Sequence, residues 1–316
     1  MTVRVPADQP TIAAAIASAS DGYTVLVAPG LYSGAGNRDL NFGGKRLNLR
    51  GTGNPSGVVI DCEGLARLIT FDHAEDSSSG VSGLTVRNCG VDYQGALYIL
   101  GAAPTISGNV FDSTIAVSGA QLFGFNGSPN VQKNLFHNTQ CDDQHLSGVL
   151  AFVNGSSPYI ANNVFVGNRC RAVNMTIPEG VTPIVANNTM VGNRAGIYID
   201  RRVSTASHWY SNNLIAGNER GVEVPFEFSP RSDNLASVFR ANIVFGNATD
   251  YLGTADLTGQ SGNLRADPLF VASPNNLRLA SGSPAIGVGA ELHAPADDFD
   301  GTPRSTPFDI GAFQFH

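Results

Sequence analysis

Six asparagines recur along the middle of the chain at a nearly constant spacing, and an apolar residue follows each of them two positions later. They are Asn109, Asn134, Asn163, Asn188, Asn213 and Asn242. Successive members are 25, 29, 25, 25 and 29 residues apart. A period of this length is typical of one supersecondary unit that is repeated and stacked, each copy burying its apolar face on the next. The repeat therefore predicts one elongated stack of coils.

Each repeat carries the pattern of two short strands and a third segment of uneven length. We expect each asparagine and the residue two positions later to point inward, where stacked amides bond one another and the neighbouring backbone. The second strand of each coil starts at a small residue, namely Gly95, Gly119, Gly148, Ala172, Gly196 or Gly221. This layout predicts an all-β, three-faced parallel solenoid. A two-layer sandwich is disfavoured because its hairpin turns would come about every 8–12 residues.

The composition agrees with a strand-rich repeat and limits the partners. Glycine is abundant, with 36 copies, and charged residues make up only 14% of the chain. The net charge of −7 argues against a nucleic-acid partner, because no strongly basic patch stands out in the sequence. No run of about 18 apolar residues is present, so no membrane span is expected. The oligomeric state is left open by the sequence.

The two ends of the chain differ from the repeat. Residues 11–19 are alanine-rich, Thr11 is placed to cap a helix, and Asp21 and Gly22 are placed to end it. We expect this helix to cover the open end of the stack, where strand edges would otherwise invite aggregation. The predicted organisation is a single domain over 1–316, with an entry coil at 1–30, coils at 31–265 and a closing module at 266–316.

Both ends also carry motifs of a known superfamily. The opening PTIAAAIASASDGYTVLVAPGLY (residues 10–32) is similar to the entry coil of many right-handed, single-stranded parallel β-helix proteins of the pectate-lyase-like superfamily. The closing motifs DPLF (267–270), LRL (277–279), SPAIG (283–287) and DIGAF (309–313) resemble a terminal module of secreted and surface β-helix proteins. The resemblance implies this fold, a secreted or cell-surface location, and a signal peptide absent from this sequence. It does not choose a function, because the superfamily includes lyases, hydrolases, epimerases, phage proteins and adhesins.

A β-helix fills its interior with side chains, so a linear polysaccharide would lie along an outer face, where successive coils are about 4.8 Å apart. Alignment on the small residues predicts two outward levels on the second strand. The first level holds Gln121, Leu150, Asn174, Tyr198 and Glu223, and the second holds Phe123, Phe152, Thr176, Asp200 and Pro225. We expect the catalytic groups to include Tyr198, Asp200, Glu223 and the adjacent Arg201 and Arg202. Asn174, Thr176 and Phe152 are expected to bind substrate.

Three further groups are candidates. Asp142, Asp143 and His145 lie in a coil lengthened to 29 residues, and insertions in repeat proteins often carry binding sites. The two carboxylates would suit Ca²⁺ and the imidazole an acid/base role, although an ordinary polar loop is an alternative. Arg171, Arg194 and Arg220 are expected to form, with Arg169, a corner row that binds a polyuronate carboxylate. His208 and Trp209 are expected to border the substrate cleft.

The four cysteines form two pairs at about one repeat of separation. Cys62 and Cys89 are 27 residues apart, and Cys141 and Cys170 are 29 apart. Each pair could therefore face across adjacent coils, either as a disulfide or as buried free thiols.

The sequence leaves three functions open. Cleavage of an acidic polysaccharide by β-elimination is favoured, mainly by the resemblance, and would use no cofactor other than Ca²⁺. Hydrolysis of a glycosidic bond would need two carboxylates about 5–10 Å apart, for which Asp200 and Glu223 are the best pair. A non-catalytic glycan-binding or surface protein is the third.

Overall fold

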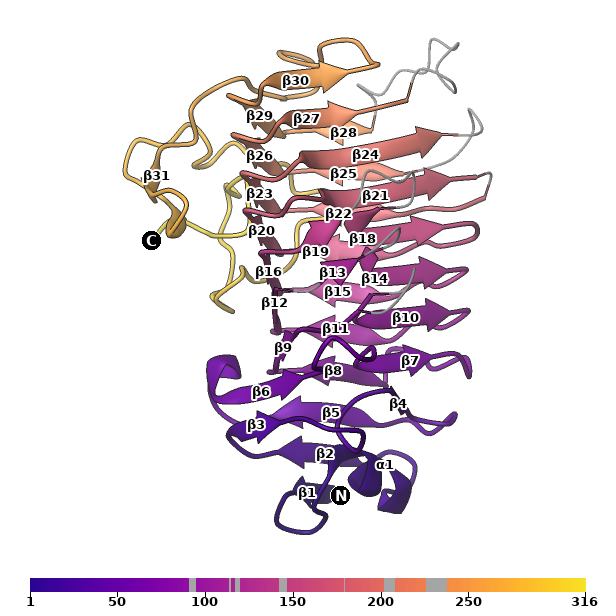
Figure 1. The fold of residues 1–316 in the computed structure, drawn as a ribbon. Coiled ribbons are helices and arrows are strands. Elements are labelled where there is room, and N and C mark those ends of the chain that lie inside the picture. Colours follow the sequence, from indigo (N-terminus) through magenta and orange to yellow (C-terminus); the bar gives the residue numbers. More distant parts are fainter. Residues whose placement is uncertain are drawn as a thin grey trace.

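The computed structural model describes residues 1–90, 95–113, 115–116, 120–141, 147–178, 180–201, 208–225 and 238–316, with Ile115, Ala116 and Arg201 described by their backbone alone. Strands from successive coils stack into three parallel sheets that wrap around one interior (Figure 1). This arrangement confirms the predicted three-faced parallel β-helix. Each coil contributes three strands, because the chain turns a corner at each repeating asparagine. From the sequence, only two strands and a variable segment were expected per coil.

The first sheet, called sheet A, has ten strands in the described residues: β1 (Thr2–Val5), β2 (Thr24–Val27), β5 (Asn48–Gly51), β8 (Gly80–Ser82), β11 (Thr105–Ser107), β15 (Asn130–Gln132), β19 (Tyr159–Ala161), β22 (Ile184–Ala186), β25 (Trp209–Ser211) and β28 (Phe239–Arg240). Sheet B has nine: β3 (Gly30–Tyr32), β6 (Val58–Asp61), β9 (Thr85–Arg87), β12 (Val110–Asp112), β16 (Leu135–His137), β20 (Val164–Val166), β23 (Thr189–Val191), β26 (Leu214–Ala216) and β29 (Ile243–Phe245).

Sheet C also has nine strands in the described residues: β4 (Leu40–Asn41), β7 (Ile69–Phe71), β10 (Leu97–Leu100), β14 (Ala120–Phe125), β18 (Gly148–Val153), β21 (Arg171–Ile177), β24 (Ala195–Arg201), β27 (Arg220–Glu223) and β30 (Thr249–Leu252). Two small sheets pair β13 (Ile115–Ala116) with β17 (Gln140–Cys141), and β31 (Phe270–Ala272) with β32 (Asn276–Leu279). A short 3-10 turn, η1, spans Pro55–Gly57.

The repeating asparagines form a continuous hydrogen-bonded ladder at the corner between sheets A and B. The backbone N and the Nδ2 of Asn163 both donate to Oδ1 of Asn188, at 2.9 and 3.0 Å. The same Nδ2 also donates to the Val131 carbonyl at 2.8 Å. The rungs continue from Asn109 to Asn263 in this way. The predicted inward asparagines are therefore confirmed, and their buried amides are satisfied by one another and by the backbone.

A second ladder follows the other polar position of the repeat, at the corner between sheets B and C. Asn168 donates to Asn193, Asn193 to Asn218, and Asn218 to Asn247, again from both the backbone N and Nδ2. Between the ladders the interior is apolar. The rings of Phe111, Phe136 and Phe165 stack at 4.9 Å between centroids, one per coil.

The helix α1 (Ile12–Ser18) forms close to the predicted bounds. Thr11 Oγ1 accepts a hydrogen bond from the Ala14 backbone N, which caps the first turn. Ile12, Ala15 and Ile16 are buried in the main core. The helix lies at the N-terminal end of the stack (Figure 1). Its role as a cap, and the proposed division of the chain at residues 30 and 265, stay predictions. In the described residues no helix is long and apolar enough to cross a membrane.

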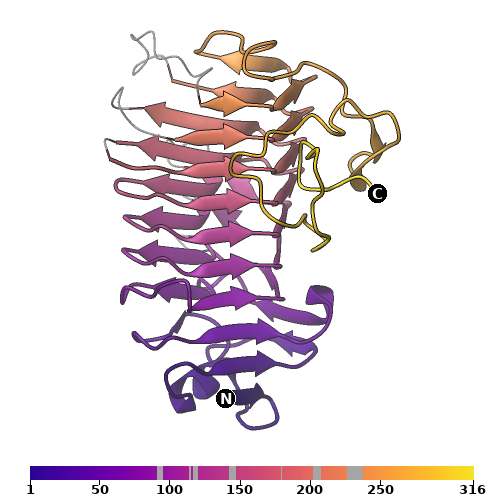
Figure 2. The same ribbon diagram turned by 180° about the vertical axis from the view of Figure 1, so that it is seen from behind.

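The C-terminal segment folds back along the side of the stack (Figure 2). Turn residues of successive coils hold it: Asn187 donates to the Asp309 carbonyl and Asn212 to the Ala290 carbonyl. The Arg304 guanidinium donates to Asn162 Oδ1 at 2.8 Å. Ala312 and Phe313 cover Val164 and Val191 on the outer side of sheet B. In these middle coils the outer face of sheet B is therefore occupied by protein.

Both cysteine pairs are disulfides, Cys62–Cys89 and Cys141–Cys170, and each joins adjacent coils. The described residues contain no free cysteine.

Replacing one rung of the first ladder should destabilise the protein strongly. Asn188→Ala removes donors to Ile160, Ala186 and Asn213 and the acceptor for Asn163, and so leaves buried groups unsatisfied. We expect a loss of about 2–4 kcal/mol in the free energy of unfolding. The exposed Asn275→Ala is the matched control and should change it by less than about 0.5 kcal/mol. Urea denaturation of the two variants measures both values, and equal midpoints would contradict the role of the ladder.

The second disulfide closes a loop with a sequence separation of 29 residues. The chain-entropy model then gives a stabilisation of about 3–4 kcal/mol. We expect the double variant Cys141→Ser/Cys170→Ser to lose this amount in urea denaturation. Thiol titration of the unreduced, denatured wild-type protein should find no free thiols, and two or more would show that a pair is open.

Candidate functional site

Strands β21, β24 and β27 of sheet C place a row of polar side chains on the outer face. Asn174 is in register with Tyr198, and Tyr198 with Glu223. Val173, Ile197 and Val222, one position earlier, belong to the core on the inner face. Neighbouring parallel strands are about 4.8 Å apart, so this row crosses three coils within about 10 Å. The sequence alignment correctly brought these three polar residues to one level.

A second level lies two residues further along the strands. Thr176 is in register with Asp200, as expected from the sequence. Both levels are buried, with exposed fractions of 2% for Tyr198, 1% for Asp200 and 8% for Glu223. An ordinary solvated sheet face would leave such side chains open to water. Buried polar and charged side chains on an outer face instead mark a candidate functional site.

The centre of the site is a cluster of four side chains, which we call the Arg171 cluster: Arg171, Tyr198, Arg220 and Glu223. The guanidinium of Arg171 lies over the Tyr198 ring, with Cζ 4.1 Å from the ring centroid. Its Nε reaches Glu223 Oε2 at 3.5 Å, across the intervening strand β24. Arg220 Nη1 donates to Glu223 Oε1 at 3.0 Å. The side chain of Arg171 thus runs along the sheet from its own strand to a strand two coils away.

The Arg171 cluster brings two guanidinium groups together. Both pair with the carboxylate of Glu223, next to a phenol ring. Asn174 lies beside it and donates from Nδ2 to the Ser147 carbonyl at 3.3 Å. Guanidinium groups match the geometry of a carboxylate, so a cluster with two of them is suited to an anionic ligand.

The predicted corner row of arginines is split in two. Arg171 and Arg220 belong to the cluster above, in register through Ala195 between them. Arg169 and Arg194 instead line a hollow of about 440 Å³ at the corner between sheets B and C, together with Glu219. The sequence grouped these arginines by their place after a polar residue. It did not reveal that those at strand starts reach over the sheet.

The prediction for Phe152 is wrong. Phe152 is in register with Met175, and its side chain is buried in the main core. The cause is that the sequence alignment set Gly148 level with Ala172. In the structure Gly148 pairs with Ala120 on the preceding strand, and it lies one register position before Ala172 on the next strand. A slip of one residue moves a side chain to the other face of a sheet. Phe123 and Ala151 are in register with Asn174 and so belong to the first outward level.

His208 and Trp209 lie at sheet A. His208 is fully buried, with its ring 5.5 Å from that of Tyr210, a core residue. The Trp209 ring contacts His293 of the C-terminal segment, and the guanidinium of Arg240 lies over it. Trp209 therefore packs on a different sheet from the Arg171 cluster, with a face already taken up by protein.

The remaining predicted residues fall outside what the structure describes. Asp142, Asp143, His145 and Arg202 lie outside the described residues. Of Arg201 only the backbone is described, in register with Ile177. The roles assigned to these five residues, including the Ca²⁺ site at Asp142 and Asp143, stay predictions.

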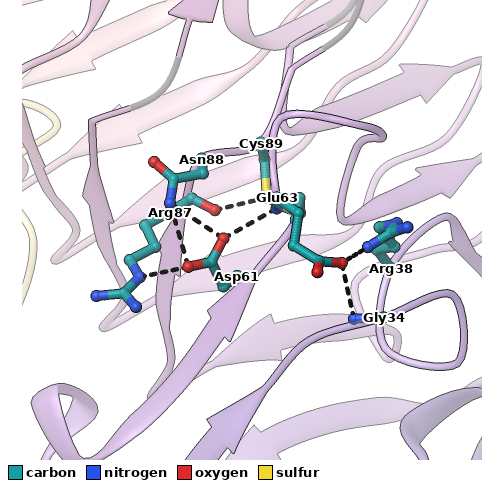
Figure 3. The surroundings of a disulfide bond; sticks show 8 residues. Gly34, Arg38, Asp61, Glu63, Arg87, Asn88 and Cys89 are labelled. Carbon is teal, nitrogen blue, oxygen red and sulfur yellow. Dashed lines mark hydrogen bonds and ion pairs between the residues drawn. A yellow bond between two sulfur atoms is a disulfide. The ribbon is translucent and has the colours of Figure 1, made fainter.

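A second group of charges lies beside the Cys62–Cys89 disulfide, around a hollow of about 420 Å³ (Figure 3). Asp61 accepts from Arg87, from Asn88 and from the backbone N of Glu63. Glu63 in turn accepts from the Gly34 backbone N and pairs with Arg38. Both carboxylates are thus bound by protein groups of neighbouring coils, and these contacts join the coils to one another.

The fold and the cluster together define a parallel β-helix protein with a buried, arginine-containing site on one sheet. Residues 130–233 match the model of a family described as a protein of unknown function, DUF1565. The matched region is about a third of the chain and contains Arg171, Tyr198, Arg220 and Glu223. No curated protein matches the sequence.

Among solved structures, the chain is similar to the crystal structure of pectate lyase Pel9A, with 15% identity and a TM-score of 0.46. That comparison covers 96% of this chain and 91% of the pectate lyase. It is also similar to the PL6 family alginate lyase AlyGC, with 14% identity and a TM-score of 0.32, covering 98% of this chain. This chain spans 57% of the alginate lyase.

Removing the carboxylate of the Arg171 cluster should cost stability. Glu223→Gln removes the carboxylate that pairs with two guanidinium groups, one of them buried, and we expect a loss of about 3 kcal/mol in the free energy of unfolding. The same change at the exposed pair of Arg278 and Asp300 is the control. Asp300→Asn should cost less than about 1 kcal/mol in the same urea titration. Equal losses at the two sites would show that the cluster is an ordinary surface ion pair.

Proposed function

We propose that this protein is carbohydrate-active and cleaves an acidic polysaccharide by β-elimination on the outer face of sheet C. The observation that carries the proposal is the Arg171 cluster, in which two guanidinium groups converge on the Glu223 carboxylate beside a tyrosine. The resemblance of the sequence ends to the pectate-lyase-like superfamily favours a polysaccharide among the possible substrates. The two guanidinium groups favour a sugar that carries a carboxylate.

The geometry of sheet C suits a linear polymer. Its outer residues repeat at about 4.8 Å from coil to coil, so several coils can contact one chain. The face of sheet B is covered by the C-terminal segment in the middle coils. Tyr198 and Asp200 are almost fully buried, so the experiments below measure the binding of a polyuronate as well as its turnover.

Each part of β-elimination has a candidate group. The guanidinium groups of Arg171 and Arg220 would bind the uronate carboxylate and stabilise the charge that develops when the adjacent C–H proton leaves. A base takes that proton, a carbon–carbon double bond forms, and the glycosidic C–O bond breaks as its oxygen gains a proton. The Tyr198 hydroxyl beside Arg171 is the candidate for one proton transfer. Arg201, Arg202 and His145 remain the candidates for the other.

Hydrolysis is the second candidate. Asp200 lies on the strand next to Glu223, two residues beyond its register partner. A glycoside hydrolase needs two carboxylates about 5–10 Å apart, one of them a protonated acid and the other ionised. Glu223 is bound by two guanidinium groups and suits only the ionised role, so Asp200 would have to be the acid, whereas elimination needs no such pair. We therefore rank elimination first.

The two disulfides also bear on where the protein works. Disulfides persist in oxidising compartments and are rare in the cytosol. We propose that the protein acts outside the cytosol, where polysaccharide substrates are found.

A panel of polyuronates, including pectate and alginate, tests the activity. Elimination creates an unsaturated uronate, so absorbance near 235 nm should rise, and new reducing ends should appear in step with it. We expect Tyr198→Phe and Arg171→Gln to lower kcat/KM by at least about 100-fold, because each removes a group that acts at the reacting sugar. Reducing ends without the absorbance rise would show hydrolysis.

The matched control is Tyr98→Phe. Tyr98 lies on β10 of the same sheet, pairs with Phe123 and has the Arg67 guanidinium 5.5 Å from its ring centroid. It therefore repeats the Arg–Tyr contact away from the site, and its variant should keep wild-type activity. Binding of a polyuronate without turnover, measured by calorimetry, would favour a glycan-binding protein. If Tyr198→Phe and Tyr98→Phe behave alike, the assignment of the site is wrong.

A further inference from the structure

Three potential metal ligands come together in the turn that follows β7. Asp72, His73 and Glu75 each offer one ligand atom, and these atoms all lie within 4.8 Å of one another. The sequence analysis did not single them out. Asp72 and His73 have side chains open to solvent, with exposed fractions of 33% and 53%, whereas Glu75 is only 4% exposed.

The chain holds these groups in place from two directions. Asn41, on the neighbouring strand β4, donates from Nδ2 to Asp72 Oδ1 at 2.9 Å. His73 Nδ1 lies 2.6 Å from the same oxygen. Ala74 takes a left-handed φ of 57°, which turns the chain so that Glu75 Oε2 accepts from the backbone N of His73 at 3.0 Å. All three side chains are therefore fixed by contacts of the turn and of the adjacent coil.

Glu75 is the observation that points to a ligand. Its other carboxylate oxygen, Oε1, is buried and makes no hydrogen bond with any described residue. No ion pair of Glu75 occurs within the described chain either, so its carboxylate lacks a counter-charge there. Burying a carboxylate without a partner is costly, and a bound cation is one of the few ways to remove that cost.

We propose that Asp72, His73 and Glu75 bind a divalent transition-metal ion. Two carboxylates and one imidazole give two negative charges and a mixed oxygen and nitrogen donor set. Such a set suits Zn²⁺ or Mn²⁺, whereas Ca²⁺ takes oxygen ligands. The solvent-facing side of Asp72 and His73 leaves room for water to complete the coordination.

This site is separate from the Arg171 cluster. Strand β7 is followed in sheet C by β10, β14, β18 and then β21, so four steps of about 4.8 Å separate the two. A metal ion at this distance cannot touch a sugar bound at Tyr198. The proposal therefore does not rest on the proposed function, and its tests use binding and stability.

Calorimetric titration of the full chain with Zn²⁺, after treatment with a chelator, tests the site. We expect one tight site in the wild type and a loss of affinity of at least tenfold in His73→Ala and in Glu75→Gln, since each removes a ligand. His73 is largely exposed, so its variant should fold normally. Asp76→Asn is the matched control, because the Asp76 carboxylate is already bound by the backbone N and the hydroxyl of Ser78.

Thermal unfolding gives a second readout. Binding to the folded state alone raises Tm with ligand concentration. Zn²⁺ should therefore raise the Tm of the wild type and of Asp76→Asn, leave that of His73→Ala unchanged, and act more strongly than Ca²⁺. Absence of Zn²⁺ binding in the wild type, or equal binding in the wild type, His73→Ala and Glu75→Gln, would overturn the proposal.

Discussion

The hydrogen bond between stacked asparagine amides is the interaction on which the architecture depends. Each rung uses two donors, the backbone N and Nδ2, on the single Oδ1 of the next coil, as between Asn163 and Asn188. At the corner, the side chain thus continues the pattern of backbone hydrogen bonds that joins neighbouring strands within each sheet. Because both ends of each bond are buried, slipping one coil by a residue would leave several amides unsatisfied. The ladder therefore fixes the register of all three sheets.

The fixed register turns residues far apart in sequence into neighbours. Arg171 and Glu223 are separated by 52 residues but meet across a single strand. The C-terminal segment decides which of these neighbourhoods are available, because it covers sheet B in the middle coils through Ala312 and Phe313. Sheet C is left to carry the buried Arg171 cluster. The asparagine ladder, the covered face of sheet B and the polar face of sheet C thus lie on different sides of each coil.

The parts of the structure that sequence reasoning predicted were those with a strict period. The inward asparagines, the inward residue two positions after each of them, and the level of Asn174, Tyr198 and Glu223 all follow from spacing. The prediction failed for Phe152, because the coil at 148–153 has a different offset from its neighbours and one residue changes the face. The reach of Arg171 over Tyr198 depends on a long side chain at a strand start. The Asp72, His73 and Glu75 turn belongs to no repeat, so no spacing marked it.

The contacts of the C-terminal segment also have a mechanical consequence. Its last residues are anchored beside the middle coils, where Asn162, Asn187 and Asn212 of three successive turns hold it. A force applied at the C terminus would therefore load these three bonds and the packing of Phe313 before it could reach the last coil. Unwinding a solenoid from its end is the easiest route of failure, because terminal repeats have only one neighbour. In this protein, unwinding from the C-terminal end requires that the C-terminal segment first detach from the side of the stack.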